Sequence, residues 1–493
     1  MIRLSVKLLI ITFIGLFLNS CVNEFDLSND SSNSNNNSND SSDTNSPLYI
    51  YPYGNEANNA IVEITIQTDG SVDLNSIETE IPPLKYNKSW LFMLTQDDCL
   101  NSAFHQTWAA INGKPISNYI NSNSQHQNSY NIRQLLAGDL PPESYNLGKT
   151  LGTDDGLGKE VRFHITTTLY PEGECMNFKD EIKPGFSGNF YRFMKYNLIW
   201  DNVKEMLNYG NSIAFHNVKT DIANESILDT VLFHLPICQD SIKKNLSNRG
   251  CKVMARPDGN ETYVQASLMF PDIQIITKEN NDYVEIYPFN VNTDLNKLSI
   301  YRFFKDNPND IKSIILTEMQ KPKEQRRAVH AGVHNTNHNW VEFLLWLNDS
   351  YGKDGDNSVW MPSLEEYYEY NFYRIHSNIT KTIIDNNTVK FTITLPSQQY
   401  FYYPSITLNL KGINNSKIQN LSTNDVVKGV NYGDYSQGVM INIDCRKYLF
   451  EHATHYVEQY ERNKTKSNKD DALYFINILK DSPQKNAPLS RIK

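Results

Sequence analysis

Four short apolar runs in the middle of the chain each end in polar side chains. The first covers residues 89–95 and is followed by Gln96, Asp97 and Asp98. Because its apolar positions are continuous and do not alternate, this run predicts a strand that is buried on both faces, as in a parallel sheet. The other three runs and their polar residues are 212–215 with His216, 251–255 with Arg256, and 328–333, which contains His330 and leads to His334.

Helical patterns separate these predicted strands. Apolar residues between 198 and 207 are spaced to line one face of a helix, and Gly210 is typical of the left-handed residue that ends one. Residues 227–248 repeat the pattern ahead of Gly250. Alternating helices and buried strands predict an α/β fold, and in its barrel form the functional residues lie at the carboxyl ends of the strands. We therefore expect the polar residues after the four runs to share one site.

From residue 378 the pattern changes to alternation. Every second residue from Val389 to Leu395 is apolar, and polar residues stand between them. Strands of this kind have one buried and one wet face, so residues 378–445 are predicted to form an antiparallel β-sandwich. A helix and a tail are expected over residues 446–493.

The N-terminus has the pattern of an export signal. Two basic residues precede an apolar stretch at 8–18, which is short for a membrane span. The four residues that end at Cys21 resemble the lipobox of bacterial lipoproteins, in which the cysteine is lipidated. The resemblance implies a lipid-anchored protein of the cell envelope, in the outer membrane on its periplasmic or surface face. Residues 22–47, rich in Asn and Ser, are expected to be a flexible tether.

The composition argues against one class of binding partner. The net charge is -10 and no stripe of Lys and Arg is present, which argues against a nucleic-acid partner. Tyrosine is abundant at 29 residues, which suits a protein that contacts sugars but also an ordinary core. Five cysteines follow Cys21, and Cys238 and Cys251 are close enough in sequence to pair, although an odd number leaves at least one free thiol.

Asp97 and Asp98 carry the clearest chemical signal. Two adjacent carboxylates at the end of a buried strand repel one another and lose solvation, unless a cation or hydrogen-bond donors compensate. Side chains alternate in direction along an extended chain, so one carboxylate can bind a metal while the other reaches a water beside it. The pair therefore predicts a divalent metal site.

The stretch 95–98, Thr-Gln-Asp-Asp, resembles the Thr-Phe-Asp-Asp motif of the NodB-homology polysaccharide deacetylases. The resemblance implies a distorted (β/α) barrel in which Asp97 is the catalytic base and Asp98 a metal ligand. It also implies that His216 is a metal ligand, that residues 256–259 form the arginine motif, with Arg256 holding Asp97 in a bidentate pair, and that His330 or His334 is the catalytic acid.

The family pattern implies a metal-dependent hydrolase, with zinc as the expected metal, that removes acetyl groups from a polysaccharide or oligosaccharide of the envelope or the diet. Its second metal-binding histidine falls on Thr220 here. Either His330, His334 or His234 fills that place, or the metal is weakly held, or activity has been lost. The alternative function is a glycan-binding surface lipoprotein without catalysis.

The expected organisation of the chain follows from these patterns. It comprises a signal peptide with lipidated Cys21 (1–21), a tether (22–47), an N-terminal β segment (48–84), the deacetylase-like barrel (85–377) with an insertion at about 100–190, the sandwich (378–445), and a C-terminal helix and tail (446–493).

Overall fold

The computed structural model describes residues 48–54, 59–117, 127–128, 144–177, 194–195, 197–221, 223–280, 282–290 and 292–492. The predicted signal peptide, Cys21 and the tether lie outside these residues. Among the described helices, none combines the length and the apolar character that crossing a membrane requires.

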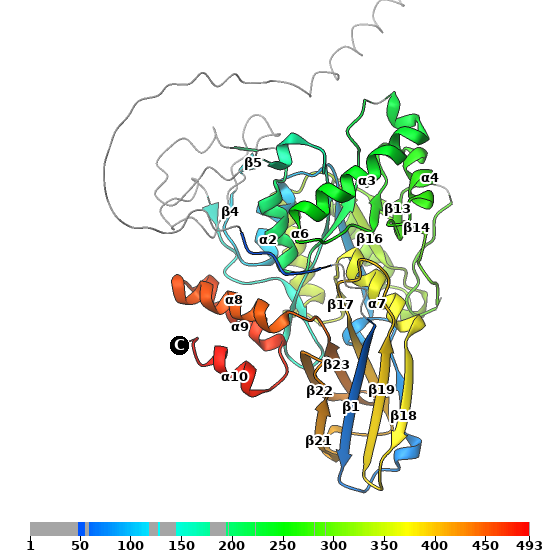
Figure 1. Ribbon diagram of the computed structural model, residues 1–493, viewed down its shortest axis with the longest axis vertical. Helices are drawn as coiled ribbons and strands as arrows, with labels where there is room; N and C mark the ends of the chain where they lie inside the picture. Colours follow the sequence, from blue (N-terminus) through cyan, green and yellow to red (C-terminus); the bar gives the residue numbers. More distant parts are fainter. Residues whose placement is uncertain are drawn as a thin grey trace, which may run out of the picture. The chain divides into compact units, whose positions relative to one another are not determined.

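A parallel sheet forms the centre of the larger part of the fold (Figure 1). Its strands follow the order β14-β13-β12-β11-β9-β3-β16-β15, and the short β17 also pairs with β3. β14 and β15 are successive pieces of one chain segment, so the order returns to its own start and the sheet is barrel-like. The α/β barrel predicted from the sequence is confirmed. The strands are β3 (Trp90–Gln96), β9 (Thr166–Leu169), β11 (Ser212–Phe215), β12 (Val253–Ala255), β13 (Ile275–Lys278), β14 (Leu298–Tyr301), β15 (Phe303–Phe304), β16 (Val329–Val333) and β17 (Val359–Trp360).

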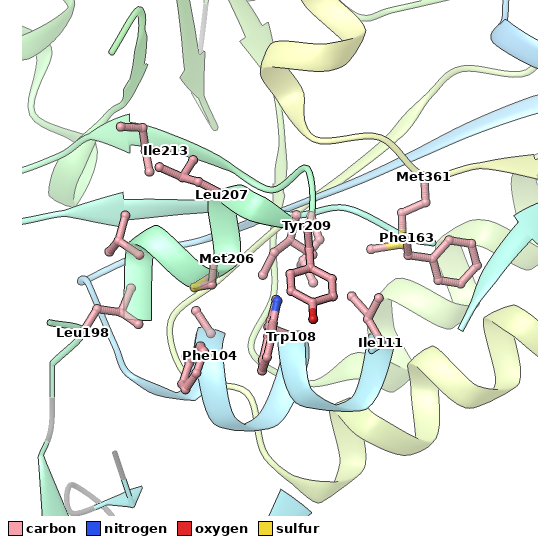
Figure 2. Close-up of a cluster of buried hydrophobic side chains, with 14 of the residues drawn as sticks. Phe104, Trp108, Ile111, Phe163, Leu198, Met206, Leu207, Tyr209, Ile213 and Met361 are labelled. Carbon is pink, nitrogen blue, oxygen red and sulfur yellow. The ribbon is translucent and has the colours of Figure 1, made fainter. Parts of the chain in front are cut away.

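Helices surround this sheet and bury their apolar faces. Val203, Met206 and Leu207 on α2 are fully or almost fully buried, as their spacing predicts. Figure 2 shows Met206 and Leu207 in one cluster with Ile213 of β11. The helices of this part are a π-helix at Ala103–Trp108 that continues into α1 (Ala109–Ile111), α2 (Trp200–Asn208), α3 (Leu228–Asn245), α4 (Glu261–Met269), α5 (Pro308–Met319), α6 (His338–Tyr351) and α7 (Leu364–His376).

Two pieces of the expected insertion belong to the barrel itself. Residues 103–111 form a buried helix, on which Phe104, Trp108 and Ile111 face the α2 cluster (Figure 2). β9 is a central strand between β3 and β11, although it begins Thr-Thr-Thr. Its hydroxyls are satisfied inside the sheet: Thr166 Oγ1 lies 2.9 Å from Ser212 Oγ, and Thr168 Oγ1 accepts from the Cys99 amide. β-branched residues suit strands, so partnered threonines can replace an apolar run.

Short two-stranded ribbons complete this part of the chain. They are β4 (Ile116–Ser117) with β6 (Ser144–Tyr145), β5 (Gln127–Asn128) with β10 (Met194–Lys195), and β7 (Gly152–Asp154) with β8 (Glu160–Arg162).

Two antiparallel four-stranded sheets form the sandwich, with orders β18-β19-β1-β21 and β2-β20-β23-β22. The N-terminal β1 lies between C-terminal strands, beside β19 in Figure 1, so the expected N-terminal β segment completes the sandwich. Val62, Ile64 and Ile66 are wholly buried on its inner face. The strands are β1 (Ala60–Thr68), β2 (Glu78–Glu80), β18 (Asn378–Ile383), β19 (Thr388–Leu395), β20 (Ser405–Lys411), β21 (Ile418–Thr423), β22 (Gly429–Tyr435) and β23 (Gly438–Asp444).

Three helices end the chain, where the sequence predicted one helix and a tail. α8 (Leu449–Arg462) corresponds to the predicted helix, and α9 (Lys466–Ile478) and α10 (Pro483–Leu489) follow it. Tyr456 and Phe475 stack with ring centroids 4.0 Å apart, which joins α9 to α8. All five described cysteines are free thiols, so Cys238 and Cys251 are not paired.

The buried face of β1 should carry much of the sandwich's stability. Replacing Ile64 by Ala removes three methyl or methylene groups from a fully buried site, so we expect a loss of about 3 kcal/mol in the free energy of unfolding, measured by denaturant titration. Ile61→Ala is the matched control, because Ile61 lies on the same strand with half its surface exposed; its effect should stay below about 0.5 kcal/mol. Equal losses in both variants would contradict the assignment of the two faces.

Candidate active site

Asp97 lies directly after β3, at its carboxyl end, and is 2% exposed. Its amide donates to the Val333 carbonyl at the end of the neighbouring β16. Its carboxylate accepts two parallel hydrogen bonds from Arg302, Nη1 to Oδ1 and Nη2 to Oδ2, both at 2.7 Å. A bidentate pair of this kind fixes the orientation of a buried carboxylate.

Arg302 holds this place, and not Arg256 as the sequence predicted. Arg256 donates to Glu261 and to Glu279, each at 3.2 Å. Glu279 also accepts from Arg302 Nε, so one carboxylate joins the two arginines. The strand order explains the difference. Arg302 precedes β15, which is separated from β3 by β16 alone, whereas Arg256 follows β12, which is separated from β3 by both β11 and β9.

Asp98 continues from Asp97 through a left-handed turn. The φ angles of Asp98 and Cys99 are 63° and 51°, a conformation that aspartate tolerates better than most residues. The turn places Asp98 Oδ1 3.3 Å from Nε2 of His216, the residue after β11. His216 Nδ1 donates to the Ala255 carbonyl at 2.8 Å, so Nε2 is the nitrogen that faces the two aspartates.

The charges of these groups are coupled. Burial lowers the pKa of His216, but Asp97 and Asp98 outweigh it, and the pKa lies above its usual value. Burial likewise raises the pKa of Asp98, but the hydrogen bond and charge of His216 outweigh it, and the pKa is lowered. A proton on His216 Nε2 therefore occupies the position that a cation beside Asp98 would take, so proton and cation would compete for this site.

His330 and His334 differ in their environments. His330 lies within β16, is 1% exposed, and has Nε2 2.8 Å from Thr95 Oγ1. Burial, followed by the charge of Arg302, lowers its pKa to about 3, so it is neutral at physiological pH. His334 lies just beyond the same strand with 44% of its side chain exposed. Its Nε2 is 3.9 Å from Asp98 Oδ2, and its Nδ1 is 3.2 Å from both carboxylate oxygens of Asp306.

The remaining candidates lie elsewhere. His234 on α3 bonds to Glu172, with Nδ1 2.8 Å from Oε1. Thr220 lies in the loop after β11, and its amide donates to the Val218 carbonyl. Within the part of the chain that the structure describes, no three His, Cys, Asp or Glu side chains are gathered closely enough to form a ready metal-binding group.

Arg302 and Asp306 are the site residues that sequence reasoning missed. Arg302 stands between aromatic residues at 301 and 303, in a segment too short to show a strand pattern. A charged residue inside an apolar run is costly to bury without a partner, and this was the available signal.

Comparisons with known proteins give a family and distant structural likenesses. A family model described as "Putative polysaccharide deacetylase" matches residues 62–493. Two solved structures of the peptidoglycan deacetylase PdaC from Bacillus subtilis, one of them a mutant, are each similar at 13% identity with a TM-score of 0.28, covering 58% of this chain and 93% of theirs. A comparison with curated protein sequences gave no match.

The Asp97–Arg302 pair should be a coupled unit for stability. Arg302→Met leaves the buried carboxylate of Asp97 without its bidentate partner, while Glu279 keeps Arg256, and we expect a loss of about 3–5 kcal/mol in the free energy of unfolding. Adding Asp97→Asn to Arg302→Met should cost less than the sum of the two single changes, because one uncompensated charge is removed.

Arg327→Met provides the comparison. Arg327 also contacts two carboxylates, those of Glu285 and Glu318, but its side chain is 25% exposed, so its loss should cost only about 1 kcal/mol. Denaturant titration of the four variants measures these differences. Strictly additive effects of the Asp97 and Arg302 changes would contradict the coupling.

Proposed function

The chain belongs to the polysaccharide deacetylase family, and from this premise we propose that it is a metal-dependent hydrolase that removes acetyl groups from a glycan. The observation that carries the proposal is the convergence of Asp97, Asp98, His216 and His334 at the carboxyl edge of the sheet. This edge is where barrel enzymes place their catalytic groups.

The donors around Asp98 fit a divalent cation. Ligand atoms that share a zinc ion at ~2.0–2.1 Å lie roughly 3.3 Å apart in a tetrahedral site, and His216 Nε2 and Asp98 Oδ1 are 3.3 Å apart. The bond from His216 Nδ1 to the Ala255 carbonyl fixes the ring so that Nε2 can bind metal, the usual outer contact of a histidine ligand. Asp98 and His216 would hold the metal, with zinc the expected ion.

Each side chain then has a role in hydrolysis. A divalent cation, when bound, supplies Lewis-acid activation of the acetyl carbonyl and of the attacking water. Asp97, oriented by Arg302, takes the proton that the water loses as its oxygen bonds to the carbonyl carbon. His334, oriented by Asp306, delivers a proton to the leaving amine or alkoxide as its bond to that carbon breaks. His330 is neutral and buried, and so is unsuited to this step.

We also propose that the substrate is a polysaccharide of the envelope or the diet, and that a lipid on Cys21 anchors the protein in the outer membrane. The lipobox resemblance at Cys21 and the Asn/Ser-rich residues up to 47 support this placement. A tethered hydrolase would work on glycan beside the membrane.

The second candidate is a glycan-binding lipoprotein without turnover. Thr220 stands where the family pattern has its second metal-binding histidine, and the described residues hold no ready group of three ligands. Two protein ligands alone would bind a metal weakly. Metal-dependent acetate release therefore separates the two candidates.

We expect the purified protein to release acetate from acetylated oligosaccharides, and chelation with EDTA to stop release until zinc, nickel or cobalt is restored. Asp97→Asn should lower the rate at least a hundredfold, since general-base catalysis contributes on the order of 10²–10⁴, while calorimetry shows unchanged metal affinity. No acetate from any acetylated glycan, with or without added metal, would favour the binding protein.

The role of His334 is tested by His334→Gln. A general acid there predicts a rate loss of about a hundredfold, disappearance of the basic limb of the pH–rate profile, and unchanged metal affinity. His338→Gln is the matched control, since His338 is similarly exposed, begins α6 and, among the described residues, pairs with Glu342 and Tyr145. A fall in metal affinity of tenfold or more in His334→Gln alone would instead make His334 the third ligand.

A further inference from the structure

A cavity of about 560 Å³ lies at the opposite end of the barrel from Asp97. We call it the basal cavity. Its walls include Lys85, just ahead of β3, and Arg162, just ahead of β9, so it lies at the amino ends of these strands. The sandwich contributes the start of β22 and the end of β23, and α9 closes another side. A volume of this size where separate parts of a fold meet is characteristic of small-molecule sites.

Among the residues that the structure describes, every basic residue in the wall of the basal cavity except one has a carboxylate partner. Lys85 contacts Glu366 at 3.1 Å, Lys353 contacts Glu160 at 3.1 Å, and Arg162 contacts Asp471 at 2.7 Å. Lys149 and Lys466 also have carboxylate partners. The two acids Asp155 and Asp444 are held by backbone amides and by Arg446.

Lys159 is the exception. Its Nζ makes no ion pair and no hydrogen bond with any residue in the described ranges, although the side chain is half-buried. Burial, together with the nearby charge of Lys485, lowers its pKa, and the charges of Asp155 and Asp481, neither of which forms an ion pair with it, offset this only in part. Arg162, by contrast, is engaged: its Nη1 donates to Asp471, its Nε lies 3.8 Å from Glu160 Oε2, and its guanidinium lies 4.2 Å from the Tyr474 ring centroid.

The uncharged part of the wall is mixed. Apolar residues such as Val430, Leu473 and Ile478 line it beside side-chain amides and hydroxyls, and each amide can make up to four hydrogen bonds, of which the protein uses only some. Asn442, for example, makes two, with Asp155 and Thr407. These neutral groups match sugar hydroxyls, and the unpaired ammonium matches a carboxylate. The amide and hydroxyl side chains of the wall belong to Asn112, Asn146, Thr150, Ser405, Asn431, Asn442, Ser467 and Asn477.

We propose that the basal cavity is a second glycan site, which binds a short segment of an acidic polysaccharide with a carboxylate of the sugar on Lys159 and its hydroxyls on the amides. Such a site would hold the polymer without taking part in hydrolysis at Asp97. It goes beyond the proposed hydrolase, because it requires no turnover.

The test is isothermal titration calorimetry of the purified protein with trigalacturonate, and with neutral triacetylchitotriose for comparison. We expect saturable binding of trigalacturonate. Lys159→Gln should weaken it at least about tenfold, the effect of losing one charged hydrogen bond. Asn431→Ala should weaken the binding of both sugars. Lys417→Gln, which removes a lysine paired with Asp69 outside the cavity wall, should change neither.

Two outcomes would overturn the proposal: no saturable binding of trigalacturonate at millimolar concentration, or equal affinity in the wild type and Lys159→Gln. The hydrolase proposal is tested separately in the same samples. Asp97→Asn should keep full trigalacturonate affinity while it loses acetate release. If the wild type binds trigalacturonate but releases no acetate, the hydrolase proposal is contradicted and the proposal of a glycan site in the basal cavity is supported.

Discussion

The ion pair between Asp97 and Arg302 links the candidate active site to the segment that closes the barrel. Arg302 stands between β14 and β15, the point at which one chain segment leaves β13 and reaches β16, and Asp97 ends the central strand β3. The bidentate bonds therefore tie the closing segment to the middle of the sheet. Two buried charges are costly unless both are fully bonded, and here Glu279 satisfies the third side of the guanidinium. The proposed base and the closure of the barrel share this contact.

Sequence reasoning succeeded where hydrophobic pattern and position agree. Continuous apolar runs identified β3, β11, β12 and β16, and because parallel strands end at one edge, the polar residues after them could be expected to meet. Asp98 and His216 do lie together. The reasoning missed β9, because its polarity hides a central strand whose threonines are bonded within the sheet. The sequence also could not show that β1 belongs to the sandwich, because the pairing of β1 with β19 spans more than three hundred residues and leaves no local signal.

Arg302 binds Asp97 in the place predicted for Arg256, and this shows what the order of motifs along a sequence cannot predict. A motif gives the sequence position of an arginine, but reach across a sheet depends on how many strands intervene. Arg256 still belongs to the network, because Glu279 links it to Arg302 and its own carbonyl accepts from Arg302 at 3.3 Å. The assembly Asp97–Arg302–Glu279–Arg256 thus alternates in sign, and each charge has an opposite neighbour. Such alternation lets four ionised groups remain buried or half-buried at the edge of one sheet.

Burial distinguishes His330 from His334, which the sequence offered as equal candidates for the catalytic acid. They stand four residues apart on one strand and its extension. His330 is buried beside Arg302 and is neutral at physiological pH, because burial and the charge of Arg302 lower its pKa to about 3, whereas His334 keeps contact with solvent and with two carboxylates. A group that exchanges protons during a reaction needs such contact, while a group that only positions others does not. His334 thus has the surroundings of a proton donor, and His330 those of a neutral partner that holds Thr95 at the end of β3.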